Sequence, residues 1–131
     1  MEKMIKIKSK IENLREVEKF IDDITAELNL SNEIYGNILI SVLEAAKNAI
    51  VHGNKNDISK NVEIKVRKEK ENLDFFIKDE GNGFDFNTIP DPTAPENIEK
   101  VNGRGVFLMK KLSDDIEFKE EGRLVKITFN T

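Results

Sequence analysis

The segment Ser41-Val-Leu-Glu-Ala-Ala-Lys-Asn-Ala-Ile-Val-His-Gly53 is predicted to be the end of a long, buried helix. In and before this segment, apolar residues recur three and four positions apart over most of the circumference, at Ile34, Ile38, Val42, Ala45 and Ala49 and at Leu39, Leu43, Ala46 and Ile50. A helix that is apolar nearly all round belongs in a protein interior. Glu44 and Asn48 nevertheless lie four positions apart on one strip of it, with Lys47 beside them. Because such groups are costly to bury without partners, the strip is either an ordinary polar helix edge or part of a site.

Length and composition restrict the class of protein. The chain has 131 residues, enough for a single domain, residues 1–131, with a core of its own. A net charge of -4 leaves no basic footprint for direct contact with nucleic acid. The lack of cysteine excludes disulfides and thiolate metal sites and favours the cytoplasm, while one histidine, His52, leaves no histidine pair for zinc. The apolar runs are too short for a membrane span, so we expect a cytoplasmic globular protein that does not bind membranes.

The first half of the chain is predicted to form one strand and two helices. Apolar and polar residues alternate over Met4–Lys8, which is typical of a short strand. Ser9 and Glu12 have the spacing of a capping box, so we expect a helix to begin directly after Ser9. Ser31 is a suitable cap for the second helix, and Gly53 is a suitable residue to end it.

The second half is predicted to form two hairpins with a short helix between them. Apolar and polar residues alternate over 62–66 and 75–77, and again over 115–119 and 124–129, so each pair of segments forms an antiparallel hairpin. A helix over 106–112 is expected to be opened by the glycines before it. This order of elements predicts an α+β fold, a two-layer α/β sandwich in which a mostly antiparallel sheet carries the helices on one face.

Two glycine motifs follow the buried helix. Asp79-x-Gly81-x-Gly83 ends an apolar strand, and a carboxylate there can accept a hydrogen bond from an exocyclic amine such as N6 of adenine. The glycines beside Asp79 permit the close approach of a flat ring. Gly103-x-Gly105 precedes a helix, where exposed backbone N–H groups bind the oxygens of phosphates. Either motif alone is weak evidence, since the first may be a plain turn.

The helix strip supplies the groups that the glycine motifs lack. The side-chain oxygen of Asn48 is a suitable hard ligand for Mg²⁺. Glu44, one turn earlier, can orient or deprotonate an attacking group. Although Glu-x-x-x-Asn recurs by chance in many helices, the three motifs in this order point to a site for ATP.

The three motifs resemble the N box and the two glycine boxes of the Bergerat-fold ATPases, the superfamily of gyrase, Hsp90, histidine kinases and MutL. Within it, Glu44-Ala-Ala-Lys-Asn-Ala-Ile-Val-His-Gly-Asn-Lys55 and Gly103-Arg-Gly-Val-Phe-Leu-Met-Lys-Lys-Leu-Ser-Asp-Asp115 are most similar to the anti-sigma factor serine/threonine kinases of bacterial partner-switching systems. The resemblance covers essentially the whole chain. Its strength lies in the combination, because each box alone is short.

This resemblance implies an ATP-binding α/β sandwich in which Asp79 binds adenine, Asn48 holds Mg²⁺ and Glu44 is the catalytic base. It implies a kinase that phosphorylates a serine or threonine of a small anti-anti-sigma (STAS-type) protein and sequesters a sigma factor. It also implies a homodimer formed through the N-terminal strand, Met4–Lys8. We further expect Pro90–Asn102, between the glycine boxes, to be a lid that closes over the nucleotide.

Several residues leave their roles open. Gyrase-like members often carry threonine after the glycine of the last hairpin, whereas here Gly122 is followed by Arg123. Arg104 stands where relatives are often apolar, and it is either a solvated arginine or a bidentate ligand of the phosphates. Lys47 either contacts a phosphate or pairs with the neighbouring glutamate. His52 is expected to interact with the last carbonyls of its helix rather than to act in catalysis.

Three other functions compete with a protein kinase. A non-catalytic module that binds a regulator only with ATP has the same motifs, although an intact Glu44 argues weakly against it. The catalytic domain of a sensor histidine kinase requires a helix pair with a phospho-acceptor histidine, and no histidine precedes the Glu44 helix. A gyrase-type or mismatch-repair protein requires further domains.

Overall fold

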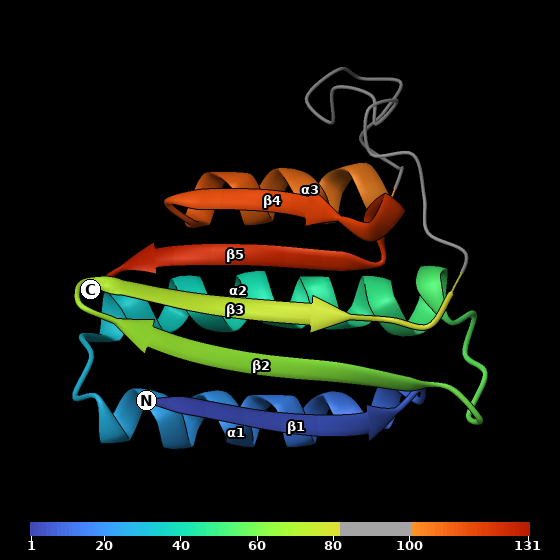
Figure 1. Cartoon of the computed structure of the whole chain (residues 1–131), viewed down its shortest axis with the longest axis horizontal. Coiled ribbons are helices and arrows are strands. Elements are labelled where there is room, and N and C mark those ends of the chain that lie inside the picture. Colours follow the sequence, from blue (N-terminus) through green and yellow to red (C-terminus); the bar gives the residue numbers. More distant parts are fainter. Residues whose placement is uncertain (82–100) are drawn as a thin grey trace.

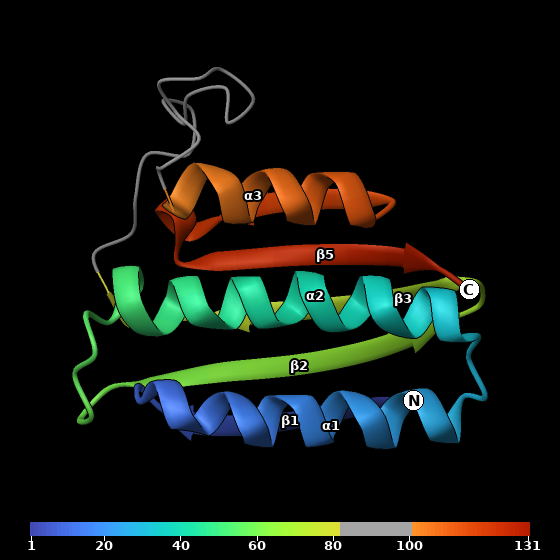
Figure 2. The ribbon, with the colours of Figure 1, turned by 180° about the vertical axis from the view of Figure 1, so that it is seen from behind.

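The computed structural model describes residues 1–81 and 101–131, except for the side chains of 101–104. Within these residues, five strands form one sheet in the order β1-β2-β3-β5-β4, with every neighbouring pair antiparallel. The strands are β1 (Glu2–Lys8), β2 (Asn61–Glu69), β3 (Asn72–Lys78), β4 (Asp115–Lys119) and β5 (Leu124–Asn130). Figures 1 and 2 show the helices on one face of this sheet, which confirms the predicted α+β sandwich.

The helical layer consists of α1 (Leu14–Glu27), α2 (Asn32–Asn48) and α3 (Val101–Leu112). Shorter elements flank them, namely the 3-10 turns η1 (Ile11–Asn13) and η5 (Glu120–Gly122) and the π turn η2 (Ala49–Gly53). In Figure 2, α2 lies between α1 and α3 and crosses the middle of the sheet. The sheet, α1 and α3 therefore cover α2 on three sides, which accounts for the apolar positions around most of its circumference.

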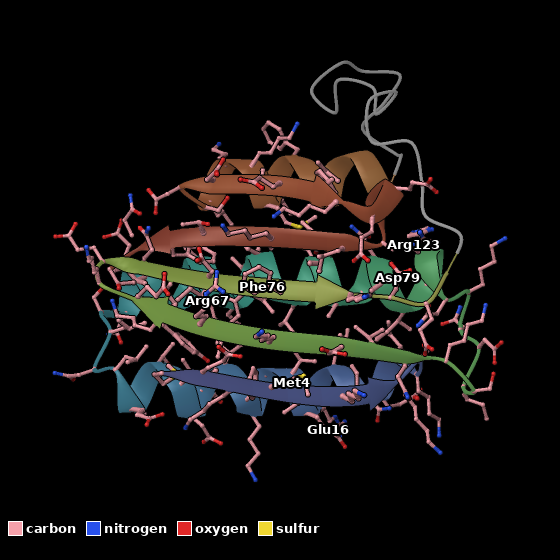
Figure 3. All side chains as sticks on the ribbon, viewed as in Figure 1. Met4, Glu16, Arg67, Phe76, Asp79 and Arg123 are labelled. Carbon is pink, nitrogen blue, oxygen red and sulfur yellow. The ribbon has the colours of Figure 1, made fainter. Side chains whose placement is uncertain are left out.

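The core lies between the sheet and the helices. It is formed by the residues of each strand that share one parity, because side chains alternate between the two faces of a strand. In β3, Phe75 is fully buried and its ring meets the edge of the Phe129 ring at a centroid distance of 6.1 Å. Phe76 has the opposite parity and lies on the open face, where Figure 3 shows it near Arg67. The guanidinium of Arg67 stands 5.2 Å from the ring centroid of Phe76.

The helical segment Asn32–Gly53 has 22 residues and contains an 18-residue window with a mean hydropathy of 1.2, so by length and composition it could cross a membrane; it is the one such segment found among the described residues. Its Ile38, Val42 and Ile50 side chains are fully buried in the sandwich. Its place at the centre of the core accounts for its apolar composition without a membrane.

The predicted capping box at Ser9 is wrong, whereas the predicted cap at Ser31 is confirmed. Ser31 accepts a hydrogen bond from the backbone N–H of Ile34 at 3.3 Å. The hydroxyl of Ser9 instead donates to the carbonyl of Lys60 at 2.7 Å, and η1 stands between Ser9 and α1. A buried partner from a distant loop therefore displaces the local cap.

The boundary of α3 also differs from the prediction. The helix begins at Val101, so Gly103 and Gly105 lie within its first turns rather than before it. The predicted lid, Pro90–Asn102, falls almost wholly outside the described residues.

The two adjacent phenylalanines of β3 test the one-sided sandwich. We expect Phe75→Ala to lower the free energy of unfolding by about 3–5 kcal/mol, because it removes a buried ring and leaves a cavity. Phe76→Ala is the matched control on the open face and should cost less than about half of that. Urea denaturation measures both values. Equal costs would contradict a sheet with one open face.

Candidate functional site

The candidate site lies at one end of the sandwich, where three chain segments meet. The end of α2 and the turn η2 come together there with the residues that follow β3 and with the start of α3 (Figure 1). Figure 3 shows Asp79 and Arg123 at this end, the first after β3 and the second just before β5. Sequence motifs that are up to sixty positions apart are thus brought into one region.

The second glycine motif packs directly on the polar strip of α2. A Cβ atom placed on Gly105 would lie 3.1 Å from the carboxylate of Glu44 and 3.1 Å from the amide nitrogen of Asn48. Few Cβ atoms tolerate neighbours at that distance, so a glycine lets α3 approach these polar groups closely. The structure therefore brings Glu44, Asn48 and Gly105 together as predicted.

The side-chain oxygen of Asn48 is buried and has no hydrogen-bond partner among the described residues. A buried acceptor without a partner costs about 1–3 kcal/mol, so such an atom in a native protein calls for an explanation. An amide oxygen is a suitable ligand for a hard cation such as Mg²⁺. Among the described residues there is no group of three or more His, Cys, Asp or Glu side chains that could hold a metal ion.

The first glycine motif packs against the end of the same helix. A Cβ atom on Gly53 would overlap the carboxylate of Asp79, and a Cβ atom on Gly81 would overlap the backbone carbonyl of Gly53. Gly53 does end the helical segment, but its backbone is not in the left-handed conformation of a glycine cap. Sequence reasoning took Gly53 for a helix stop and missed that its main function is to leave room for Asp79.

One π turn extends α2 toward Asp79. The backbone N–H of Asn54 donates to the carbonyl of Ala49 at 2.8 Å, five residues back rather than four. Such turns are rare and are frequent at functional sites. Here the wider turn carries Gly53 to the end of β3.

The carboxylate of Asp79 is held in a buried and directed position. Its own N–H donates to the carbonyl of Arg123 at 2.9 Å, and its Oδ1 accepts from the N–H of Gly81 at 2.8 Å. Burial raises the pKa of Asp79, while the Gly81 hydrogen bond and the positive charges of Arg123 and Lys60 oppose that rise. The result is a hydrogen-bond acceptor at the wall of an apolar space.

A pocket opens between α2, α3 and the sheet. Its apolar wall comes from small and branched side chains, Ala45, Ala49, Ile77, Val106, Met109 and Val125. Asn48 and Asp79 supply polar atoms to the same pocket. An apolar cleft with a few fixed polar groups is typical of a site for a flat organic ring.

His52 and Arg123 also line this pocket, and sequence reasoning assigned neither of them to the site. Burial lowers the pKa of His52, and the nearby charge of Lys47 lowers it further. Lys47 therefore lies close enough to the pocket to act on a pocket residue electrostatically, but it forms no ion pair with Glu44 within 4 Å. The period of α2 could have indicated His52, which is one turn beyond Asn48.

The remaining predicted site residues are only partly described. Gly83 lies outside the described residues. Gly103 and Arg104 lie in the first turn of α3, where the backbone alone is described. Their predicted contacts with phosphate stay predictions.

Comparison with known proteins agrees with this geometry. The chain matches the histidine kinase-like ATPase domain over residues 7–129. Serine-protein kinase RsbW of Bacillus cereus strain Q1 is 26% identical over 131 residues, which cover 95% of this chain and 81% of that protein. RsbW of Bacillus cereus strain AH187 is 31% identical over 96 residues, 68% of this chain and 59% of that protein. RsbW of Bacillus anthracis strain CDC 684 is 26% identical, again over 95% of this chain and 81% of that protein.

Two glycines of the same helical segment test the packing at the site. Gly53→Ala should lower the free energy of unfolding by at least about 1–3 kcal/mol, because its Cβ would overlap the Asp79 carboxylate. Gly36→Ala, the matched control, has no atom within 4 Å of its new Cβ and should instead stabilise the protein by about 0.5–1 kcal/mol. Thermal or urea denaturation measures the difference. A Gly53→Ala protein as stable as Gly36→Ala would contradict the contact with Asp79.

Proposed function

Because the chain belongs to the histidine kinase-like ATPase family, we propose that it is a cytoplasmic serine/threonine protein kinase that uses Mg·ATP. The observation that carries the proposal is the packing of Gly105 on Glu44 and Asn48, together with the packing of Gly53 and Gly81 around Asp79. This packing supports the proposal because it brings together, at one end of the fold, the residues to which we assign adenine binding, cation binding and proton transfer.

The proposed nucleotide site uses each of these parts. The adenine ring enters the apolar pocket and its exocyclic amine donates a hydrogen bond to the carboxylate of Asp79. The phosphates lie toward the N-terminus of α3, with Gly103, Arg104 and Lys47 as further ligands. The side-chain oxygen of Asn48 would hold Mg²⁺, which would supply positive charge to neutralise the phosphates.

The proposed reaction transfers the γ-phosphoryl group to a protein hydroxyl. The hydroxyl oxygen of a serine or threonine forms a bond to the γ-phosphorus as the bond to the β–γ bridging oxygen breaks, and ADP leaves. Glu44 accepts the hydroxyl proton. The closeness of Glu44 to Asn48, with Gly105 against both, supports this assignment.

The proposed protein substrate is a small anti-anti-sigma protein of the STAS type, and the proposed second partner is a sigma factor. The name of the RsbW relatives supports a serine as the acceptor. The sequence resemblance supports the partners and a homodimer.

Two buried aspartates on β3 and at its end allow a controlled test of the adenine site. Asp79→Asn should weaken ATP binding by about tenfold to a hundredfold, because it removes a charge-assisted hydrogen bond to the adenine amine. Asp74→Asn is the matched control, since Asp74 is equally buried but accepts from Thr128 Oγ1 at 2.6 Å on the open face. Isothermal calorimetry should find its ATP affinity unchanged. Parental affinity in Asp79→Asn would reject this site.

The catalytic base is tested by Glu44→Gln, which is nearly isosteric. ATP affinity should stay close to that of the parent, while transfer of labelled γ-phosphate to a serine or threonine of a co-purified small partner should fall at least about a hundredfold. Glu33→Gln, in the exposed first turn of the same helix, is the control and should transfer at the parental rate. Parental transfer by Glu44→Gln would show that Glu44 is not the base. A parent that binds ATP and a partner but transfers nothing would instead be a non-catalytic binding module.

A further inference from the structure

Asn54, directly after the π turn, is a buried amide that joins three separate segments. Its side chain is 1% exposed. Its Oδ1 accepts from the backbone N–H of Glu80 at 2.7 Å, and its Nδ2 donates to Ser9 Oγ at 2.8 Å and to the carbonyl of Asn61 at 3.0 Å. One amide therefore binds the end of β1, the start of β2 and the residue that follows Asp79.

The surrounding bonds make this amide part of a closed network. The Ser9 hydroxyl donates a hydrogen bond to the carbonyl of Lys60 at 2.7 Å, and the N–H of Asn61 donates to the carboxylate of Glu80. Glu80 is thus tied to the start of β2 twice, once through Asn54 and once through its own side chain. Buried polar networks whose members are all satisfied hold a single geometry.

The place of Asn54 relative to Asp79 gives this network a consequence for the site. The N–H of Asp79 is held from one side by the carbonyl of Arg123, and the next N–H along the chain is held from the other side by Asn54. Asn54 also follows Gly53, whose backbone lies against the Asp79 carboxylate. Among the described side chains, Asn54 alone hydrogen-bonds the backbone directly after Asp79 and thereby joins it to the end of the α2 helix.

We propose that Asn54 is a positioning residue that fixes the direction of the Asp79 carboxylate and so sets the selectivity of the pocket for adenine over guanine. The inference rests on the proposed function, in which Asp79 binds the base. An ionised carboxylate only accepts hydrogen bonds, so it bonds to the amine of adenine and repels the carbonyl oxygen that guanine carries at the same ring position. This discrimination depends on the direction of the carboxylate.

The test compares ATP and GTP binding in matched variants. Asn54→Ala should lower ATP affinity by about tenfold, because the carboxylate loses its fixed direction, while GTP affinity measured by competition should change less than about threefold. Ser9→Ala removes a group of the same network that is equally buried but does not touch the Asp79 loop. It should lower the melting temperature and leave the ATP/GTP affinity ratio within about twofold of the parent, since it spares the bond to Glu80.

The outcomes separate this inference from the proposed function. A parent without preference for ATP over GTP would refute base reading by Asp79 and the role of Asn54 together. A parent that prefers ATP, with the same ratio in Asn54→Ala, would leave the proposed function standing and reduce Asn54 to a purely structural residue.

A measurement on the parent protein covers the case in which Asn54→Ala does not fold. In the free parent, the amide hydrogen of Glu80 should exchange with solvent as slowly as that of Asp79, because each is held by a hydrogen bond. A Glu80 amide that exchanges at the rate of an unprotected peptide would overturn the proposal.

Discussion

The carboxylate of Asp79 lies against the backbone of Gly53, and the remaining geometry of the site depends on this contact. A strand end and a helix end can approach this closely only where the helix lacks a Cβ atom. The π turn η2 extends the helix as far as Asp79, and the hydrogen bonds of Asp79 to Gly81 and Arg123 fix the orientation of its carboxylate. Burial then raises the pKa of the Asp79 carboxyl group. The positive charges of Arg123 and Lys60 oppose that rise and so favour the ionised carboxylate, which accepts hydrogen bonds.

Two asparagines, Asn48 and Asn54, lie six positions apart and differ in how their side-chain amides are hydrogen-bonded. Asn54 has both ends of its amide satisfied by fixed partners, as a buried polar group in a stable protein should. Asn48 is on the same helical segment, yet its side-chain oxygen is buried without a partner among the described residues. Burying this oxygen without a partner lowers the free energy of unfolding, and a ligand that bonded to the oxygen would offset that loss. The two amides thus differ in hydrogen bonding, since Asn54 is fixed by three partners while the side-chain oxygen of Asn48 has none among the described residues.

The sequence predicted the secondary-structure elements better than it predicted the contacts between them. Alternation and helical period were enough for the α+β sandwich, and the spacing of Glu44 and Asn48 placed them correctly on one strip. The capping box at Ser9 failed because its local pattern is identical whether the hydroxyl caps a helix or meets Lys60, fifty-one positions away. The prediction that Gly53 ends the helix is confirmed, but its contact with Asp79 was missed for a similar reason, since only the sheet brings Asp79 to it. Local signals cannot show which distant backbone will compete for a polar group.

Arg123 stands where gyrase-like proteins often carry threonine. It acts on Asp79 both through its backbone and through its side chain. Its backbone carbonyl accepts the N–H of Asp79, and a carbonyl is present whatever the side chain. Its side chain adds a positive charge that opposes the rise in the Asp79 pKa, which a neutral threonine would not do. Arg123 thus holds the backbone of Asp79 through its carbonyl group and favours the ionised form of the carboxyl group through its side-chain charge. An acceptor that stays ionised keeps its hydrogen-bonding role at lower pH, so the charge of Arg123 preserves the acceptor function of Asp79.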